Sequence, residues 1–209
     1  MRWNPGEAGG YEQLALPTVT HTKSGKAGDP INVGLIGEAE EIVHAFLAAD
    51  WQPADVISLK STVRILKDVV FKRNDPNAPV SDLYLWGRPQ DLAFEQEVNG
   101  SPRQRHHVRL WISDITVNRR PLWIGASTYD RGVYLRKFSH HIAPDIDAER
   151  AHLFATLTHA SLTAGIVIVP GAGRTDHGRN GEDDPFFTDG QIHIGRLKPI
   201  VAEKLMTQD

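Results

Sequence analysis

Four strand-like segments in the middle of the chain constrain the fold more than any other feature. They are rich in β-branched and aromatic residues, and turn-forming residues separate them at 99–102 and 118–121. Strands joined by short turns pair antiparallel with their neighbours in the sheet. The pattern therefore predicts an antiparallel meander. The four segments are residues 82–87, 93–98, 106–112 and 122–129.

Helical periodicity and further strand-like runs surround this meander. In the segment 38–50, apolar side chains recur at the spacing that places them on one face of a helix. Together the segments predict one α+β domain, with a mostly antiparallel mixed sheet and about three packed helices. The expected helices are residues 38–50, 58–71 and 147–161, and the further expected strands are 31–36, 165–169 and 191–197.

Apart from this domain, the chain has two terminal segments without periodicity. We expect an N-terminal arm at residues 1–27, the α+β domain at 28–200 and a C-terminal tail at 201–209. The segment 171–190 is polar and rich in glycine, and we expect a long loop there.

Composition removes several classes of function. The 209 residues include no cysteine, which excludes thiol nucleophiles, disulfides and iron–sulfur clusters. The formal net charge of −3 gives no overall electrostatic case for binding nucleic acid. No apolar run approaches ~20 residues and no signal-like segment is visible, so we expect no transmembrane segment and a cytoplasmic location.

The segment 103–111, RQRHHVRLW, is the strongest candidate for a site. Side chains alternate between the two faces of a strand, so Arg105, His107 and Arg109 should lie in a row on one face. Such a row could bind an anion, because arginine makes planar, charge-assisted hydrogen bonds to carboxylate and phosphate. A charged strand that faces solvent is the alternative. His106, among apolar neighbours, is expected to be a hydrogen-bonded core histidine.

The segment 140–150, HHIAPDIDAER, gathers histidines and acids beside an expected helix. Imidazole and carboxylate are ligands for a divalent metal ion and can also transfer protons. His140, His141 and Asp145 are therefore candidate metal ligands. The same three residues, together with His107 and Asp147, are candidate catalytic residues. Alternatively, the acids cap the helix and interact with its dipole.

Three other features could contribute to binding. Arg88, in WGRPQD, could add a further cation to the arginine row, and Asp130, in YDRG, is a further candidate ligand-binding residue. The glycines of the segment 170–184 could let backbone N–H groups converge on an anion. A flexible loop is the alternative interpretation of that last segment.

Taken together, these stretches resemble the LssY C-terminal domain family, over about residues 28–195. Members of this family are often fused behind membrane domains of the phosphatidic-acid-phosphatase type. By association, the resemblance implies a phosphorylated or other anionic ligand, but it implies no catalytic residues. The stretches that carry it are GDPINVGLIG, ADWQPAD, APVSDLYLWGRPQDLAFEQ, SPRQRHHVRLW, PLWIGASTYDRGV, HHIAPDIDAER, PGAGRTDHGRNG and TDGQI.

Three functions follow as hypotheses. The first is a site for an anionic or phosphorylated small molecule or lipid headgroup, with Arg105 and Arg109 binding the anion, and with metal-assisted hydrolysis as its activity. The second is a non-catalytic module that senses a ligand or binds a protein beside a membrane phosphatase. In the third, both motifs only stabilise the fold, and their polar groups are buried in hydrogen bonds away from any cavity.

Overall fold

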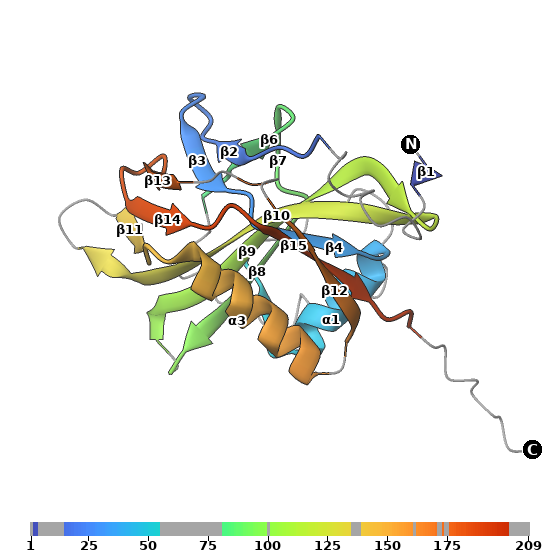
Figure 1. The fold of residues 1–209 in the computed structure, drawn as a ribbon. Coiled ribbons are helices and arrows are strands. Elements are labelled where there is room, and N and C mark those ends of the chain that lie inside the picture. Colours follow the sequence, from blue (N-terminus) through green and yellow to red (C-terminus); the bar gives the residue numbers. More distant parts are fainter. Residues whose placement is uncertain are drawn as a thin grey trace, which may run out of the picture.

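The computed structural model describes residues 2–3, 15–54, 81–99, 101–134, 139–160, 162–170, 173 and 176–200. Within this part of the chain, one large mixed sheet forms the centre of the fold (Figure 1). The short strands β1 (Arg2–Trp3) and β11 (Ser139–Ile142) pair with β9 and β10 of this sheet, respectively. In spatial order its other strands are β12 (Thr163–Val169), β15 (Ile192–Leu197), β4 (Val33–Ile36), β10 (Arg120–Tyr134), β9 (Ser101–Val117), β8 (Leu92–Val98) and β5 (Gln52–Pro53).

The predicted meander is confirmed for β8, β9 and β10, which pair antiparallel in sequence order. The β9–β10 turn consists of Asn118 and Arg119, whose φ angles are 53° and 66°. Two consecutive left-handed residues give a turn whose twist matches that of the flanking strands. At the other side of β10, β4 pairs antiparallel with β10 and parallel with β15, which makes the sheet mixed.

The first expected strand of the meander, at 82–87, is wrong in its extent. A tight turn at Trp86 and Gly87, with φ angles of 52° and 75°, divides this region into two short strands. Both belong to a separate four-stranded sheet, called the small sheet below, and not to the large sheet. The strands of that second sheet are β3 (Ala27–Pro30), β2 (Val19–His21), β6 (Tyr84–Leu85) and β7 (Arg88–Pro89).

Two helices occur in the described part of the chain, rather than about three. Helix α1 (Ala39–Ala48) begins with a capping box between Glu38 and Glu41, and α3 (Ile146–His159) begins at the cap Asp145. These two confirm the helices expected at 38–50 and 147–161. The helix expected at 58–71 lies outside the described residues.

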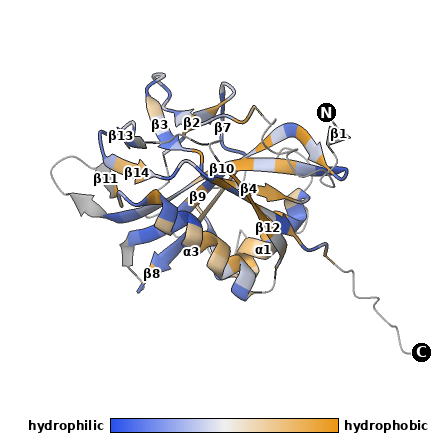
Figure 2. Cartoon of the chain, viewed as in Figure 1, coloured by the Kyte–Doolittle hydropathy of each residue, from blue (hydrophilic) through white to orange (hydrophobic). Residues whose placement is uncertain are grey.

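Apolar side chains are buried on both faces of the large sheet. One cluster joins the sheet to α1 and α3, with Phe46, Trp51 and Phe154 among its members. The other joins the opposite face to the small sheet, through residues such as Trp111 and Leu85. Figure 1 shows the two helices on one side and the small sheet on the other, and Figure 2 shows apolar residues along β4 and α1.

The long loop expected at 171–190 is replaced in part by a hairpin. Its strands, β13 (Asp176–Arg179) and β14 (Pro185–Thr188), pair antiparallel, and Asn180 accepts backbone hydrogen bonds within the connection. Phe186 of β14 is buried against Ile142 and Ile146. This apolar anchor holds the hairpin beside α3 and places its tip over the large sheet.

Candidate functional site

Strand β9 carries the arginine row, and packing on both sides buries the middle of the strand, residues 107–111. Arg105, His107 and Arg109 share one face and are 4%, 4% and 6% exposed. Val108 and Leu110 alternate with them and belong to the core beneath the helices. The row is therefore not a charged strand that faces solvent.

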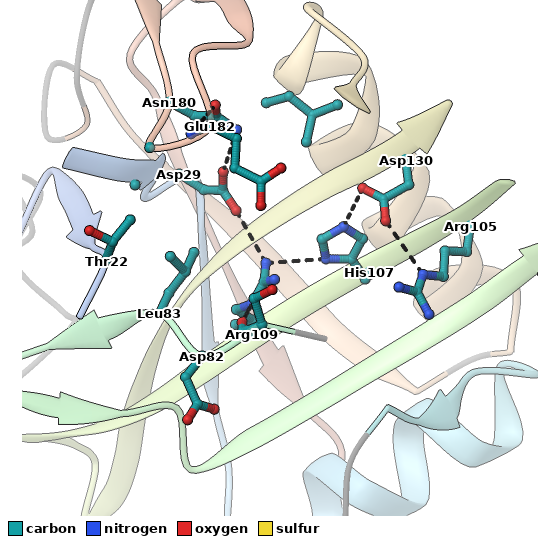
Figure 3. A pocket seen from close by; sticks show the side chains of 14 residues that line it. Thr22, Asp29, Asp82, Leu83, Arg105, His107, Arg109, Asp130, Asn180 and Glu182 are labelled. Carbon is teal, nitrogen blue, oxygen red and sulfur yellow. Dashed lines mark hydrogen bonds and ion pairs between the residues drawn. The ribbon is translucent and has the colours of Figure 1, made fainter. Parts of the chain in front are cut away.

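A cavity of about 190 Å³ lies against this face of β9 (Figure 3). All three segments that the sequence singled out border it. The first supplies the arginine row, the second supplies Ile142 at the end of β11, and the third supplies Asn180 and Glu182 at the tip of the β13–β14 hairpin. Further lining residues are Thr22, Gly28, Asp29, Ser81, Asp82, Leu83, Asp130 and Gly181.

Asp130, on β10, connects the first two members of the row. One carboxylate oxygen accepts a hydrogen bond from His107 Nε2 at 2.9 Å, and the other pairs with Arg105 Nε at 3.4 Å. Arg105 Nη1 in turn donates to Glu95 of β8 at 2.8 Å. Burial raises the pKa of the Glu95 carboxyl group, and the positive charge of Arg105 opposes this shift. Glu95 and Arg105 lie on adjacent strands, so this ion pair joins β8 to β9.

Arg109 is held by three neighbours at the wall of the cavity. Its Nε donates to the Ser81 carbonyl at 3.2 Å, and its Nη1 donates to Asp29 Oδ2 at 3.1 Å and to His107 Nδ1 at 3.2 Å. An arginine can only donate, so Nδ1 of His107 is the acceptor. The imidazole thus carries its proton on Nε2, which donates it to Asp130.

Two of the five N–H donors of Arg109 are not used in this arrangement. Its Nε contributes one bond and its Nη1 two, whereas Nη2 has no hydrogen-bond partner among the described residues. Gly125 of β10 permits the close approach of the strands here, since a Cβ atom would lie 2.6 Å from the Arg109 carbonyl oxygen. The guanidinium group is therefore fixed in position, and the two N–H groups of its Nη2 remain available as donors.

At the hairpin tip, Asn180 fixes two of the backbone N–H groups. The backbone N–H groups of Glu182 and Asp184 donate to Asn180 Oδ1, at 3.0 and 2.9 Å. These amides are thus occupied and form no anion cradle. Asn180 Nδ2 also contacts Asp29 Oδ1 at 3.3 Å, and Asp184 accepts a hydrogen bond from the Ile142 amide at 3.1 Å. These contacts join the tip to β3 and to β11.

Glu182 lies at the exposed rim of the cavity, with its carboxyl group extending into the space beside Asp29 (Figure 3). Its carboxylate has no hydrogen-bond partner among the described residues. Partial burial raises the pKa of this group, and the negative charges of Asp184, Asp29 and Asp130 raise it further. Glu182 is thus an exposed acid at the cavity whose carboxylate has no partner in the described part of the chain.

The other predicted site residues either lie away from the cavity or have side chains that the structure does not describe. Arg88 binds Asp91 and the Ile112 carbonyl, and Asp145 caps α3 through the Ala148 amide at 3.0 Å. Asp147 accepts hydrogen bonds from the Thr188 hydroxyl and the Asp189 amide, each at 2.7 Å. None of the three lines the cavity, and the acids have the structural roles that the alternative interpretation gave them.

His140 and His141 belong to β11 by their backbone, but their side chains lie outside the description. Among the side chains that are described, no three histidines or acids are grouped so that they could hold a metal ion. The metal site proposed for His140, His141 and Asp145 therefore stays a prediction.

Sequence reasoning missed Asp29, Glu95 and Glu182, which complete the charged network. Arg109 and Asp29 are 80 positions apart, and Asn180 and Asp29 are 151 apart. The one available signal was that Asp29, in GDPINVGLIG, is an acid directly before a buried strand. No local pattern could have paired it with an arginine on β9.

The helix-facing side of β9 carries a second histidine–carboxylate pair. His106 Nδ1 lies 2.7 Å from Glu149 of α3, and the His106 ring stacks on His152 with centroids 3.8 Å apart. His152 Nε2 contacts Gln96 at 2.9 Å. Burial and the neighbouring His106 lower the pKa of His152 to about 4. His106 is hydrogen-bonded as expected, and it is partly buried.

The fold and the cavity define the molecule as a single α+β domain with a charged recess between the large sheet, the four-stranded sheet and the β13–β14 hairpin. The sequence matches the family described as LssY C-terminus over residues 13–192, and the chain belongs to that family. A search of the curated proteins and a search of the solved structures each found no match. In the part of the chain that is described, no helix has the length and apolar character needed to cross a membrane.

Proposed function

We propose that this domain binds a small phosphorylated or otherwise anionic molecule in the cavity beside β9, with Arg109 as the anchor. The observation that carries the proposal is the unused Nη2 of a buried, immobilised guanidinium group at the cavity wall. The two N–H donors of Nη2 belong to a positively charged group and suit phosphate or carboxylate oxygens.

The environment of Arg109 favours such binding. Three hydrogen bonds already fix its side chain, so the ligand does not have to immobilise a flexible arginine, which reduces the entropy cost of association. The volume of about 190 Å³ is below the range usual for drug-sized ligands, so the occupant is of the size of a lipid headgroup or a small phosphate ester.

Buried charges are costly to retain unless they are paired or used. Replacing a buried ion network by apolar residues often leaves a protein as stable or makes it more stable. Here the network of Arg105, Asp130, His107, Arg109 and Asp29 borders an open space instead of filling the core. This position supports a binding role over a purely structural one.

Hydrolysis of a phosphate ester is the second candidate, and Glu182 is the observation in its favour. Its raised pKa suits a general acid, whereas Asp29 is paired with Arg109. In this reaction water attacks phosphorus, the ester P–O bond breaks, and the leaving oxygen takes the Glu182 proton. The phosphate formed from the attacking water then returns a proton to Glu182 through solvent. His107 is less suited to this role, since both of its ring nitrogens are already hydrogen-bonded.

Calorimetric titration with inorganic phosphate and with glycerol 3-phosphate tests the proposal. We expect R109K to fold and to bind both probes at least about tenfold more weakly, because a lysine lacks the planar donors. The matched control is R150K: Arg150 is equally buried and is paired with Asp189, away from the cavity. Absence of binding by the wild type, or equal losses in both variants, would overturn the proposal.

Release of inorganic phosphate from glycerol 3-phosphate separates the two candidates. A hydrolase should lose turnover in E182Q but keep its affinity for glycerol 3-phosphate. A wild type that binds glycerol 3-phosphate without releasing phosphate is a binding module for that ligand.

A further inference from the structure

The cavity has an excess of negative charge that an anion alone does not match. Its lining includes four carboxylates and only two guanidinium groups. A ligand that contained phosphate alone would bring more negative charge into this space. The four acids are Asp29, Asp82, Asp130 and Glu182, and the two cations are Arg105 and Arg109.

Ion pairs within the protein balance only part of this charge. Arg105 pairs with Glu95 and Asp130, and Arg109 pairs with Asp29. Asp82, which is exposed, accepts a hydrogen bond from Gln90 at 3.1 Å. Glu182 is the lining acid whose carboxylate has neither a hydrogen bond nor an ion pair within the described residues. Partial burial raises the pKa of its carboxyl group, and the negative charges of Asp184, Asp29 and Asp130 add to this shift.

Two sets of unused contacts therefore face the same small space. One is the pair of N–H donors on Arg109 Nη2, which suits an anion. The other is the Glu182 carboxylate, which extends from the hairpin tip into the space beside Asp29 (Figure 3). A ligand that used both would carry an anionic group at one end and a hydrogen-bonding cation at the other.

We infer that the ligand is a phosphorylated amino alcohol, with its phosphate on Arg109 and its primary ammonium group on Glu182. This inference rests on the proposed function and specifies its ligand. A primary ammonium group donates hydrogen bonds to a carboxylate, whereas a trimethylammonium group has no N–H to donate. Phosphoethanolamine is the smallest probe with both groups, and phosphocholine and glycerol 3-phosphate each lack the ammonium donor.

Titration calorimetry at pH 8, in the presence of a chelator, tests this inference. At this pH the phosphate group is a dianion and the amine still carries its proton. We expect phosphoethanolamine to bind the wild type at least about tenfold more tightly than phosphocholine or glycerol 3-phosphate, since a charge-assisted hydrogen bond contributes that much.

The variant E182Q should lose this preference and keep its affinity for glycerol 3-phosphate. The control is D183N on the same hairpin tip, where Asp183 is exposed, pairs with Arg179 and has a φ of 72° that asparagine tolerates. We expect D183N to retain the wild-type preference.

The possible failures are distinct. Equal affinities of the wild type for phosphoethanolamine and glycerol 3-phosphate, or a preference that survives in E182Q, would overturn this inference and leave the proposed function standing. If none of the phosphate probes binds, the proposed function fails as well.

The amino alcohol group could belong to a free molecule or to a membrane lipid. Sedimentation with vesicles of phosphatidylethanolamine in phosphatidylcholine distinguishes the two sources. Sedimentation that depends on phosphatidylethanolamine and is lost in R109K identifies a lipid headgroup. Binding of soluble phosphoethanolamine without sedimentation identifies a free molecule.

Discussion

The two faces of β9 carry the same pair of groups in different surroundings. On one face His107 is hydrogen-bonded to Asp130 at 2.9 Å, and on the other His106 is bonded to Glu149 at 2.7 Å. The first pair borders a cavity and continues into two arginines, whereas the second is covered by α3. Under the proposed function, the adjoining open space and unused donors are what distinguish the first pair, at a ligand site, from the second.

The electrostatic environments of the two carboxylates also differ. Asp130 faces Arg105 as well as His107, so a full positive charge balances it. Glu149 has no arginine partner in the described structure, and burial raises the pKa of its carboxyl group although His106 opposes the shift. Its second oxygen and the Ser127 hydroxyl are buried without hydrogen-bond partners in that part of the chain. The helix-facing pair is therefore the less well satisfied of the two.

Removing each carboxylate in turn should give the largest difference in stability between the two faces. We expect D130A to lower the free energy of unfolding by about 3–5 kcal/mol, because it leaves Arg105 buried with an incomplete set of partners. E149A should cost only about 1–2 kcal/mol, because it removes a carboxylate that burial already destabilises. Urea denaturation at pH 7 measures both, and an equal or greater loss in E149A would contradict the comparison.

Replacing each histidine with phenylalanine should give the next largest effect. H107F removes one hydrogen bond to the buried Asp130 and one to the buried Arg109, so we expect a loss of about 2–3 kcal/mol. H106F keeps an aromatic ring against His152 and should lose about 1 kcal/mol. Urea denaturation at pH 7 measures both losses. A larger loss in H106F than in H107F would show that the helix-facing pair is the stronger one.

A glutamine at position 149 should change how stability depends on pH. Because the pKa of Glu149 is raised in the fold, the unfolded chain releases this proton at a lower pH than the folded chain does. Glu149 thus lowers stability as pH rises above the ordinary carboxyl range. We expect E149Q to remove this decrease and to gain about 1 kcal/mol at pH 8, since the glutamine has no buried charge to desolvate. Denaturation midpoints at pH 4, 6 and 8 test this expectation. If the midpoints of E149Q and of the wild type change in parallel with pH, the expectation is wrong.

Replacing His152 should change the pH dependence of stability least. The effect of His152 is opposite to that of Glu149, because it lowers stability as the pH falls. Its pKa is lowered to about 4, so as the pH falls below about 6.5 the unfolded chain takes up a proton before the folded chain does. Stability should therefore fall between pH 6.5 and 4. H152Q should reduce this loss by roughly 0.5 kcal/mol at pH 5, since solvent screens a half-buried group. H44Q, at an exposed position on α1, is the control and should follow the wild type.

Local patterns predicted much of the fold and part of the site. Turn residues at 118–121 and alternating runs predicted the β9–β10 hairpin, and helical spacing predicted α1. The strand expected at 82–87 was wrong because Trp86 and Gly87 form a turn with two positive φ angles. The hairpin at 176–188 was expected as a loop, because its polar, glycine-rich sequence does not reveal that Phe186 anchors it.

The sequence by itself determined that Arg105, His107 and Arg109 share one face of a strand, because side-chain alternation in a strand depends only on the neighbouring backbone. Only the tertiary structure decided that this face borders a cavity and that Asp29, Asp130 and Glu182 surround it. Those acids come from three separate segments of the chain. Their meeting depends on how the small sheet and the β13–β14 hairpin pack over the large sheet, and such long-range packing has no local periodicity from which it could be predicted.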